Sequence, residues 1–190
     1  MLRVLLVNDT DKPVADLKGA LEAAGYEVLP HAAAAGLLKA VEQLQPDVII
    51  LDVDSPSRDT LEQLAMLDRH APKPVVMFSA DGNDQLIRDA LGAGVAAYVV
   101  DGLAPSRLAP ILSVAMARFE QQTHARHRLD DLERKLRDRK DVDRAKGLLM
   151  DKRGMSEAEA YTALRQQAMK QGVKLADVAR RIIAMADLLG

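Results

Sequence analysis

The sequence predicts an α/β domain with a five-stranded, doubly wound parallel sheet, followed by a long coiled-coil helix and an all-α bundle of three helices. Three observations support this prediction. Five short apolar runs alternate with segments of helical periodicity in the first part of the chain. Apolar residues then recur at steps of three and four within a charged stretch, and three further helical stripes follow. A chain of 190 residues is long enough for two domains, which a long central helix would divide.

The five apolar runs predict five strands. They lie at residues 4–7, 28–29, 48–51, 75–78 and 97–100. Their side chains are apolar at consecutive positions, which is typical of strands buried on both faces of a parallel sheet with helices on either side. Between the runs, leucine and valine side chains share helix faces. Gly25 and Gly94 stand where helices are expected to end.

Polar residues follow four of these predicted strands. Binding sites in such sheets lie at the carboxyl ends of the strands. The residues there are Asn8, Asp9, Asp52, Asp54, Ser79 and Asp101. Carboxylates that converge on one crevice repel each other unless a cation lies among them, so we expect a divalent-metal site with Asp9, Asp52 and Asp54 as candidate ligands. A set of solvated loop aspartates is the alternative.

One stretch of this region has a family resemblance. Val48-Ile-Ile-Leu-Asp52-Val-Asp-Ser-Pro56, with Asn8-Asp9 before it and Ser79-Ala80 and Tyr98 after it, resembles a response-regulator receiver domain over residues 1–117. The resemblance implies that Asp52 is the phosphoacceptor, Asp9 a magnesium ligand and Ser79 the hydroxyl that senses the phosphoryl group. Magnesium in this pocket is therefore possible, but no cofactor is expected to be required.

Two positions differ from the receiver pattern. Asn8 stands where the family usually has a second acid, and Asp101 stands where it has its phosphoryl-binding lysine. An acyl phosphate on Asp52 would carry nearly two negative charges, which an ammonium stabilises and a carboxylate repels. At an effective dielectric of about 20, like charges about 4 Å apart oppose each other by about 4 kcal/mol. We therefore expect a scaffold switched by a partner protein, with activation by phosphorylation of Asp52 as the alternative.

A long helix over residues 105–140 is predicted to act as a spacer. Apolar or small residues recur along it at Leu108, Ile111, Ala115, Ala125, Leu129, Leu132 and Leu136, with Gln122 as an interruption. This spacing is the seam of a coiled coil. Because the rest of the helix is too charged for a core, we expect a second copy of the chain to cover the seam, chiefly at its three leucines. The alternative is a solvated surface helix with a chance repeat.

Charge is distributed unevenly along the chain. Residues 1–117 contain 9 Lys/Arg and 16 Asp/Glu, a net charge of −7, whereas residues 118–190 contain 17 and 12, a net charge of +5. This asymmetry favours a polyanion as the partner of the second half, with an ordinary solvated basic surface as the alternative. The candidate phosphate contacts are Arg139, Lys140, Arg144, Lys146, Lys152, Arg153, Arg165 and Lys170. Among them Lys146 and Arg165 are preferred, because no acid is adjacent to them in the sequence.

Several classes of protein are disfavoured by composition. The chain has no cysteine, which excludes disulfides, thiolate chemistry and a thiolate zinc site. It shows no signal-peptide pattern and no apolar run of membrane-spanning length, so we expect a cytoplasmic protein with no membrane partner. The four histidines have no nucleophile or acid-base partner at a recognisable spacing. We therefore expect a protein that is not an enzyme.

The last part of the chain predicts three helices. The first covers residues 142–150, and the second begins with Ser156 and Glu159, which form a capping-box pair. A turn at Gly172 leads to the third helix. Gly147 lies inside the first helix, where glycine costs about 1 kcal/mol relative to alanine, so another backbone is expected to approach it closely. A neighbouring helix is the preferred candidate and a nucleic-acid strand is the other. Three helices of this kind also fit a DNA-binding helix-turn-helix.

A second resemblance covers this region. Ala145-Lys-Gly-Leu-Leu-Met150, followed by the motifs at 155–161, 164–165, 168–169 and 175–179, resembles an ANTAR domain over residues 129–185. This region is similar to the output domain of AmiR/NasT-type antiterminators, and the receiver with Val100-Asp-Gly102 resembles the NasT branch. This resemblance implies binding to paired hairpins in nascent leader mRNA, which prevents formation of a terminator, and control by a nitrate/nitrite sensor protein. Tyr161 fits either the core or a platform on which an RNA base stacks.

The expected organisation has three parts that overlap along the chain. A receiver-like regulatory domain occupies residues 1–117, a coiled-coil spacer residues 105–140 and an ANTAR RNA-binding domain residues 129–190. The function expected from them is transcription antitermination by a homodimer, as part of nitrate assimilation. A phosphorylation-activated regulator and a DNA-binding response regulator are the alternatives.

Overall fold

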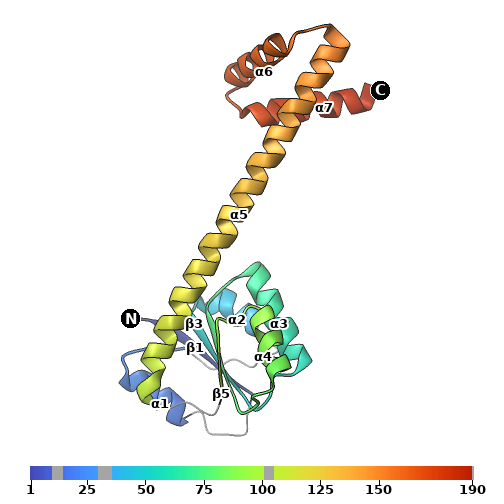
Figure 1. The fold of residues 1–190 in the computed structure, drawn as a ribbon. Helices are drawn as coiled ribbons and strands as arrows, with labels where there is room; N and C mark the ends of the chain where they lie inside the picture. Colours follow the sequence, from blue (N-terminus) through green and yellow to red (C-terminus); the bar gives the residue numbers. More distant parts are fainter. Residues whose placement is uncertain (10–14, 30–35, 101–104, 190) are drawn as a thin grey trace. The chain divides into compact units, whose positions relative to one another are not determined.

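The computed structural model contains the expected five-stranded parallel sheet (Figure 1). It describes residues 1–9, 15–29, 36–100 and 105–189, with residues 9, 15, 16, 105, 106 and 189 described by their backbone alone. The strand order is β2-β1-β3-β4-β5, and every neighbouring pair is parallel. The strands are β1 Arg3–Asp9, β2 Glu27–Val28, β3 Val48–Val53, β4 Val75–Ser79 and β5 Ala97–Val100.

Helices cover both faces of the sheet, which confirms the doubly wound prediction (Figure 1). They are α1 Ala15–Ala23, α2 Leu37–Leu44, α3 Arg58–His70, α4 Asp84–Gly92 and the start of α5 Pro105–Arg153. Successive residues of β1 point to opposite faces: Leu5 joins the core cluster of α2, α3 and α4, whereas Leu6 joins that of α1 and α5. Consecutive apolar residues of this strand therefore pack alternately into the two hydrophobic cores, one on each face of the sheet.

Two glycines end helices as expected. Gly25 follows α1 with φ of +83°, and Gly94 follows α4 with φ of +98°. A Cβ at position 94 would lie 2.7 Å from the Cβ of Asp68 in α3. Both positions therefore favour glycine for its backbone freedom, and Gly94 also lets α4 end close against α3.

Helix α5 differs from the prediction in two ways. The spacer and the first helix of the bundle form one continuous helix of 49 residues, where the sequence analysis placed a separate helix at 142–150. In addition, Leu108 and Ala115 are fully buried against the sheet, and Ile111 packs on the same cluster. The prediction that these three residues belong to the dimer seam was therefore wrong. The start of α5 packs beside α1 on one face of the sheet, and these residues are part of the core between them.

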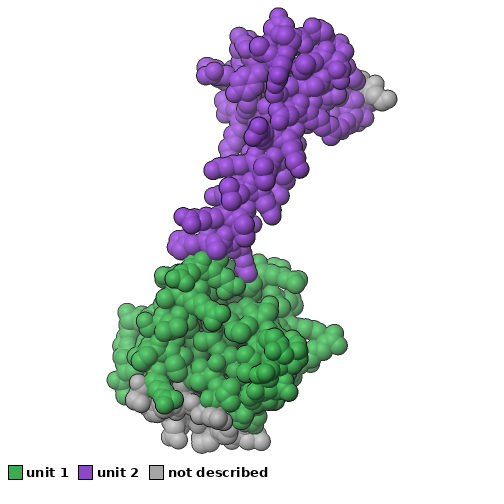
Figure 2. Space-filling view, viewed as in Figure 1, with its two compact units in different colours: residues 1–123 green, residues 124–190 purple. Residues whose placement is uncertain are grey.

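The chain divides into a first unit, residues 1–123, and a second unit, residues 124–190 (Figure 2). The second unit consists of the end of α5 with α6 Glu157–Gln171 and α7 Leu175–Leu189. Its core contains Ala145, Leu164, Ala168, Val178, Ala179 and Ile183. The predicted capping box is present, and Gly172 ends α6 in the left-handed conformation. No helix in the described ranges has the length and apolar composition needed to cross a membrane.

Candidate functional sites

The parallel register brings the predicted pocket residues to one end of the sheet. Asn8 of β1 is paired with Asp52 of β3, and Val53, the next residue, is paired with Ser79 of β4. Asn8 and Asp52 are half-buried, while Asp54 is exposed in the loop that follows β3. The side chain of Asp9 and the whole of Asp101 lie outside the described residues, so the roles predicted for them stay predictions.

The hydroxyl of Ser79 is held by the backbone of the pocket. The side chain is 3% exposed, and its Oγ donates a hydrogen bond of 2.9 Å to the carbonyl oxygen of Asp54. The same Oγ accepts a hydrogen bond of 3.1 Å from the backbone N–H of Asp81. Ser79 therefore ties the loop after β3 to the loop after β4. To donate to a phosphoryl oxygen it would have to give up its bond to Asp54.

Asp81 is a pocket residue that the sequence analysis missed. Its carboxylate accepts hydrogen bonds of 2.9 Å from the hydroxyl of Ser55 and from the backbone N–H of Asn83. Its carbonyl oxygen accepts a bond of 2.8 Å from the hydroxyl of Tyr98 on β5. These bonds join the loop after β3, the loop after β4 and strand β5. Only the bond to Asn83, two residues further along the chain, follows a local sequence pattern from which the role of Asp81 could have been predicted.

The metal prediction depends on a side chain that is not described. Within the described ranges, no three His, Asp or Glu side chains are grouped so that they could hold an ion. The chemistry of the donors nevertheless suits a hard cation, since Asp52 offers a carboxylate and Asn8 an amide oxygen on neighbouring strands. A divalent ion bound there would offset the negative charge of the pocket, and Asp9 would have to complete its ligands.

The second unit contains the predicted phosphate contacts. The structure corrects the prediction for Lys146, one of the two preferred candidates. Lys146 was expected to have no acidic neighbour, yet its Nζ lies 2.9 Å from a carboxylate oxygen of Asp143 and 2.7 Å from one of Glu157. Its side chain is 16% exposed. The hydrogen bonds that the Lys146 ammonium donates to Glu157 and to Asp143 raise the pKa of Lys146. Asp143 lies one turn before Lys146 on α5, and Glu157 is the first residue of α6, which follows the turn after α5. Lys146 therefore links α5 to the start of α6.

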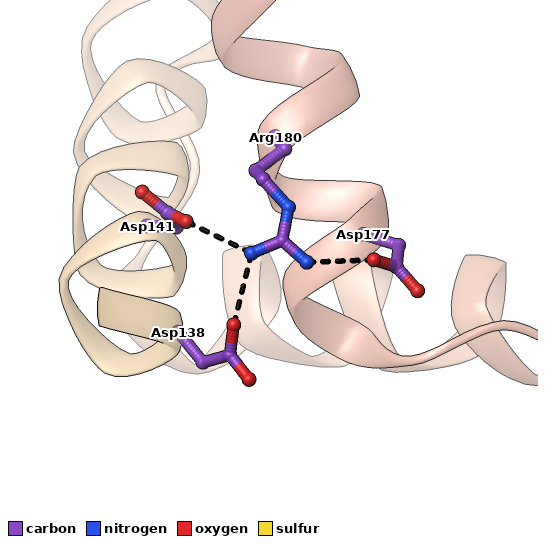
Figure 3. Close-up of polar contacts among 4 residues, drawn as sticks. All are labelled: Asp138, Asp141, Asp177 and Arg180. Carbon is purple, nitrogen blue, oxygen red and sulfur yellow. Dashed lines mark hydrogen bonds and ion pairs between the residues drawn. The ribbon is translucent and has the colours of Figure 1, made fainter. Parts of the chain in front are cut away.

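The guanidinium of Arg180 on α7 donates hydrogen bonds to three carboxylates (Figure 3). One guanidinium nitrogen lies 2.9 Å from Asp138 and 3.1 Å from Asp141, both on α5, and the other lies 2.7 Å from Asp177. Hydrogen bonding to these acids raises the pKa of Arg180, and its bond to Asp177 lowers the pKa of that carboxyl. The cluster joins α7 to α5. From the sequence, only the pair of Asp177 and Arg180, three residues apart on one helix, could have been predicted. The bonds to Asp138 and Asp141 depend on the packing of α7 against α5.

Two more of the predicted cations are engaged by acids. Arg144 lies 2.8 Å from Asp187 of α7, and Arg139 lies 4.0 Å from Asp143. Five predicted cations are exposed and make no ion pair or hydrogen bond with any part of the chain that the structure describes. They are Lys140, Lys152, Arg153, Arg165 and Lys170. We call these five residues the unpaired cations.

The exposed apolar residues of the second unit bear on two predictions. Leu129, Leu132 and Leu136 are 61%, 57% and 60% exposed, which both a dimer seam and a solvated surface helix predict, so the seam stays a prediction. Tyr161 on α6 is 44% exposed, which excludes it from the core of this unit. One turn further along α6 lies Arg165. An aromatic face therefore stands beside an unpaired cation, an arrangement suited to an unstacked nucleic-acid base and its phosphate.

Gly147 was expected to mark a close approach of another backbone, most simply a neighbouring helix. Among the described residues, no atom outside its own helix backbone and sequence neighbours lies within 4 Å of the place a Cβ would occupy. The helices of the same chain are therefore not the reason for this glycine.

Comparison with protein families separates the same two parts of the chain. The model of the response regulator receiver domain matches residues 4–113, and the model of the ANTAR domain matches residues 130–183. The chain is 31% identical over 182 residues to the transcriptional regulatory protein PdtaR of Mycobacterium tuberculosis, which covers 95% of this chain and 89% of PdtaR. The fold and these matches define a response regulator. The chain belongs to the response regulators in which a receiver domain precedes an ANTAR domain.

Other relatives share the receiver alone. The transcriptional regulatory protein KdpE of M. tuberculosis is 33% identical over 129 residues, which is 64% of this chain and 56% of KdpE. A protein-glutamate methylesterase of Rhodospirillum rubrum matches over 28% of its own length, within its receiver. The solved receiver domain of a modulated diguanylate cyclase from Desulfovibrio desulfuricans has a TM-score of 0.55 at 22% identity, over 64% of this chain and 98% of that one. This last likeness shows the fold.

Proposed function

We propose that this protein is a cytoplasmic transcription antiterminator whose ANTAR domain binds paired hairpins in a nascent leader mRNA and prevents terminator formation. The observation that supports the proposal best is the set of unpaired cations beside the exposed Tyr161. Acids within the chain already neutralise Lys146, Arg144 and Arg180, so the cations left over are available to phosphates. We expect phosphates to supply much of the affinity and stacking on Tyr161 to help select loop bases.

The proposed active form is a homodimer. The three seam leucines are each more than half exposed in a single chain, and a second α5 would cover them. A dimer presents two ANTAR domains, so two linked hairpins gain from effective concentration in a way that one hairpin does not. This bivalency gives a physical reason for recognition of hairpins in pairs.

Control is proposed to come from a partner protein rather than from phosphorylation. Asp101 replaces the lysine expected in the receiver pattern, and the hydroxyl of Ser79 is already bonded to Asp54. Both features disfavour an acyl phosphate on Asp52. Resemblance to the NasT branch suggests a nitrate/nitrite sensor as that partner and nitrate assimilation as the controlled process. Magnesium bound near Asp52 would lower the electrostatic cost of phosphorylation, so the phosphorylation test below includes it.

The test begins with recovery of the RNA that crosslinks to the protein in cells. A synthetic copy of the recovered leader, with its two hairpins, then competes with duplex DNA of the same sequence for purified protein at fixed salt. We expect the RNA to be preferred by at least about a hundredfold, because loop bases are exposed for stacking in RNA hairpins and hidden in a duplex. Equal or stronger binding to the duplex would overturn the proposal and support a DNA-binding regulator.

A further inference from the structure

Three hydrogen bonds form a closed ring between the loop after β3 and the loop after β4. The hydroxyl of Ser55 donates to the carboxylate of Asp81 over 2.9 Å. The backbone N–H of Asp81 donates to the Oγ of Ser79 over 3.1 Å, and that Oγ donates to the carbonyl oxygen of Asp54 over 2.9 Å. Asp54 and Ser55 are consecutive residues, so the peptide bond between them closes the ring. The position of the Ser79 hydroxyl therefore depends on how firmly the two loops are joined.

The loop after β4 is the fixed side of this ring. The second carboxylate oxygen of Asp81 accepts a hydrogen bond of 2.9 Å from the backbone N–H of Asn83. Its carbonyl oxygen accepts one of 2.8 Å from the hydroxyl of Tyr98 on β5. The loop also lies close against β5, since a Cβ at Gly82 would be 3.3 Å from the side chain of Val100. The loop after β4 therefore has attachments outside the ring that hold Asp81 in place.

Ser55 joins the loop after β3 to that fixed side. The residue is exposed, but its acceptor is a carboxylate, and a hydrogen bond to a charged group is stronger than one between neutral groups. If this bond is lost, the ring opens. The carbonyl of Asp54 is then held less firmly within reach of the Ser79 hydroxyl.

We propose that Ser55 and Asp81 form a latch. It keeps the Ser79 hydroxyl bonded to Asp54 and so withholds it from a phosphoryl group on Asp52. A hydroxyl has one proton to donate, so while Ser79 donates to the Asp54 carbonyl it does not donate to a phosphoryl oxygen. The negative charge of the phosphoryl group then lacks one stabilising hydrogen bond. The inference rests on the phosphoacceptor role expected of Asp52 and is independent of RNA binding.

Matched serine variants of the full-length protein test the latch. Ser55→Ala removes the hydroxyl, and Ser55→Thr retains one. Ser57→Ala is the control in the same loop, because the Ser57 hydroxyl makes its bonds with Thr60 of α3. Amide hydrogen exchange of residues 79–83 is measured by mass spectrometry without magnesium or a phosphodonor. We expect exchange there to be about fivefold faster in Ser55→Ala, the change typical of one lost hydrogen bond, and unchanged in the other two variants.

Phosphorylation provides a second measurement, which a loss of stability alone would not increase. A carboxylate oxygen of Asp52 attacks the phosphorus of acetyl phosphate, and acetate leaves with the electrons of the broken P–O bond. Each serine variant is combined with Asp101→Lys, incubated with acetyl phosphate and magnesium, and followed by intact mass. Ser55→Ala should gain the phosphoryl group about fivefold faster than Asp101→Lys alone. Ser57→Ala should be no faster, although the loss of its helix cap lowers the melting temperature.

The outcomes distinguish the latch from a general loosening of the loop. Unchanged exchange in Ser55→Ala would overturn the proposal, and so would the absence of the phosphoryl group from every variant. Faster exchange without faster phosphorylation would show that the contact joins the loops but does not withhold the Ser79 hydroxyl, which also contradicts it. An equal effect of Ser57→Ala would assign the change to lost stability. None of these measurements involves RNA, so the latch and the proposed function can fail separately.

Discussion

Single residues of the second unit show where sequence reasoning about charge succeeds and where it fails. Arg165 was chosen because no acid is adjacent to it in the sequence, and it is exposed with no partner among the described residues. Lys146 was chosen for the same reason, but Glu157 reaches it across the reversal between α5 and α6. Adjacency in the sequence does not reveal pairing that the tertiary fold creates. The unpaired cations could be separated from the paired ones only with the fold in hand.

The first prediction contrasts Lys146 with Arg165. Lys146→Ala should lower the melting temperature and leave the salt dependence of RNA binding unchanged, because it removes the link between Asp143 and Glu157. Arg165→Ala should leave the melting temperature unchanged and reduce the slope of log affinity against log salt by about 0.7 per lost phosphate contact on single-stranded RNA. Thermal melts and binding titrations at several salt concentrations measure both. The reverse pattern would return Lys146 to the RNA site.

The second prediction concerns pH and the cluster around Arg180. The bond from Arg180 lowers the pKa of Asp177 below its ordinary value of 3.8, so the carboxylate stabilises the fold above that value and loses this contribution as pH falls through its folded-state pKa. Asp177→Asn should therefore melt below the parent protein at pH 7, and the difference should shrink as pH falls below about 4. Thermal melts from pH 7 to about 2.5 test this. A difference that stays constant throughout would show that the charge of Asp177 is not the cause.

At the scale of elements, the strands and the caps were predictable because their signals are local. Runs apolar at consecutive positions define β1, β3 and β4, and Ser156 with Glu159 defines the start of α6. Helix α5 was predicted less well. The same spacing of apolar residues includes Leu108 and Ala115 at its start and the three leucines further on. The spacing therefore did not show that the first turns of α5 pack against the sheet while the later leucines are exposed. Periodicity identifies a buried face but does not identify what covers it.

The third prediction tests the exposed part of that face. Leu132→Glu should give monomers, because two carboxylates would be buried without partners in the seam. Binding to a two-hairpin RNA should then weaken about a hundredfold or more, while binding to one hairpin changes little. Sedimentation and titration with the two RNAs measure these effects. An equal loss on both RNAs, or an unchanged dimer, would contradict the role assigned to the seam.

At the scale of the whole molecule, the first unit has the receiver fold, and two residues of its predicted pocket differ from the receiver pattern. The sequence revealed this departure at Asn8 and Asp101, since both are single substitutions in a recognisable motif. It did not reveal the hydrogen bonds that fix the loops around Asp81 and Ser79, because those join residues from separate strands and loops. The proposed control of the second unit by the first is therefore tested by measuring the antitermination activity and the phosphorylation of pocket variants.

The fourth prediction separates control by a partner from control by phosphorylation. Asp52→Asn should keep antitermination largely intact, and acetyl phosphate with magnesium should add little phosphoryl group to Asp52 when the intact mass is measured. Asp101→Lys should increase that modification, because an ammonium stabilises the acyl phosphate. Loss of antitermination in a folded, dimeric Asp52→Asn protein would establish that phosphorylation matters.

Transcription through the recovered leader in a purified system tests the central claim most directly. RNA polymerase transcribes a template that contains the two hairpins and the terminator, and the fraction of full-length transcript is measured with and without the protein. We expect the protein to raise that fraction, and we expect Leu132→Glu and Arg165→Ala to raise it less at the same concentration. An unchanged or lowered fraction, on an RNA that the protein demonstrably binds, would contradict an antitermination function.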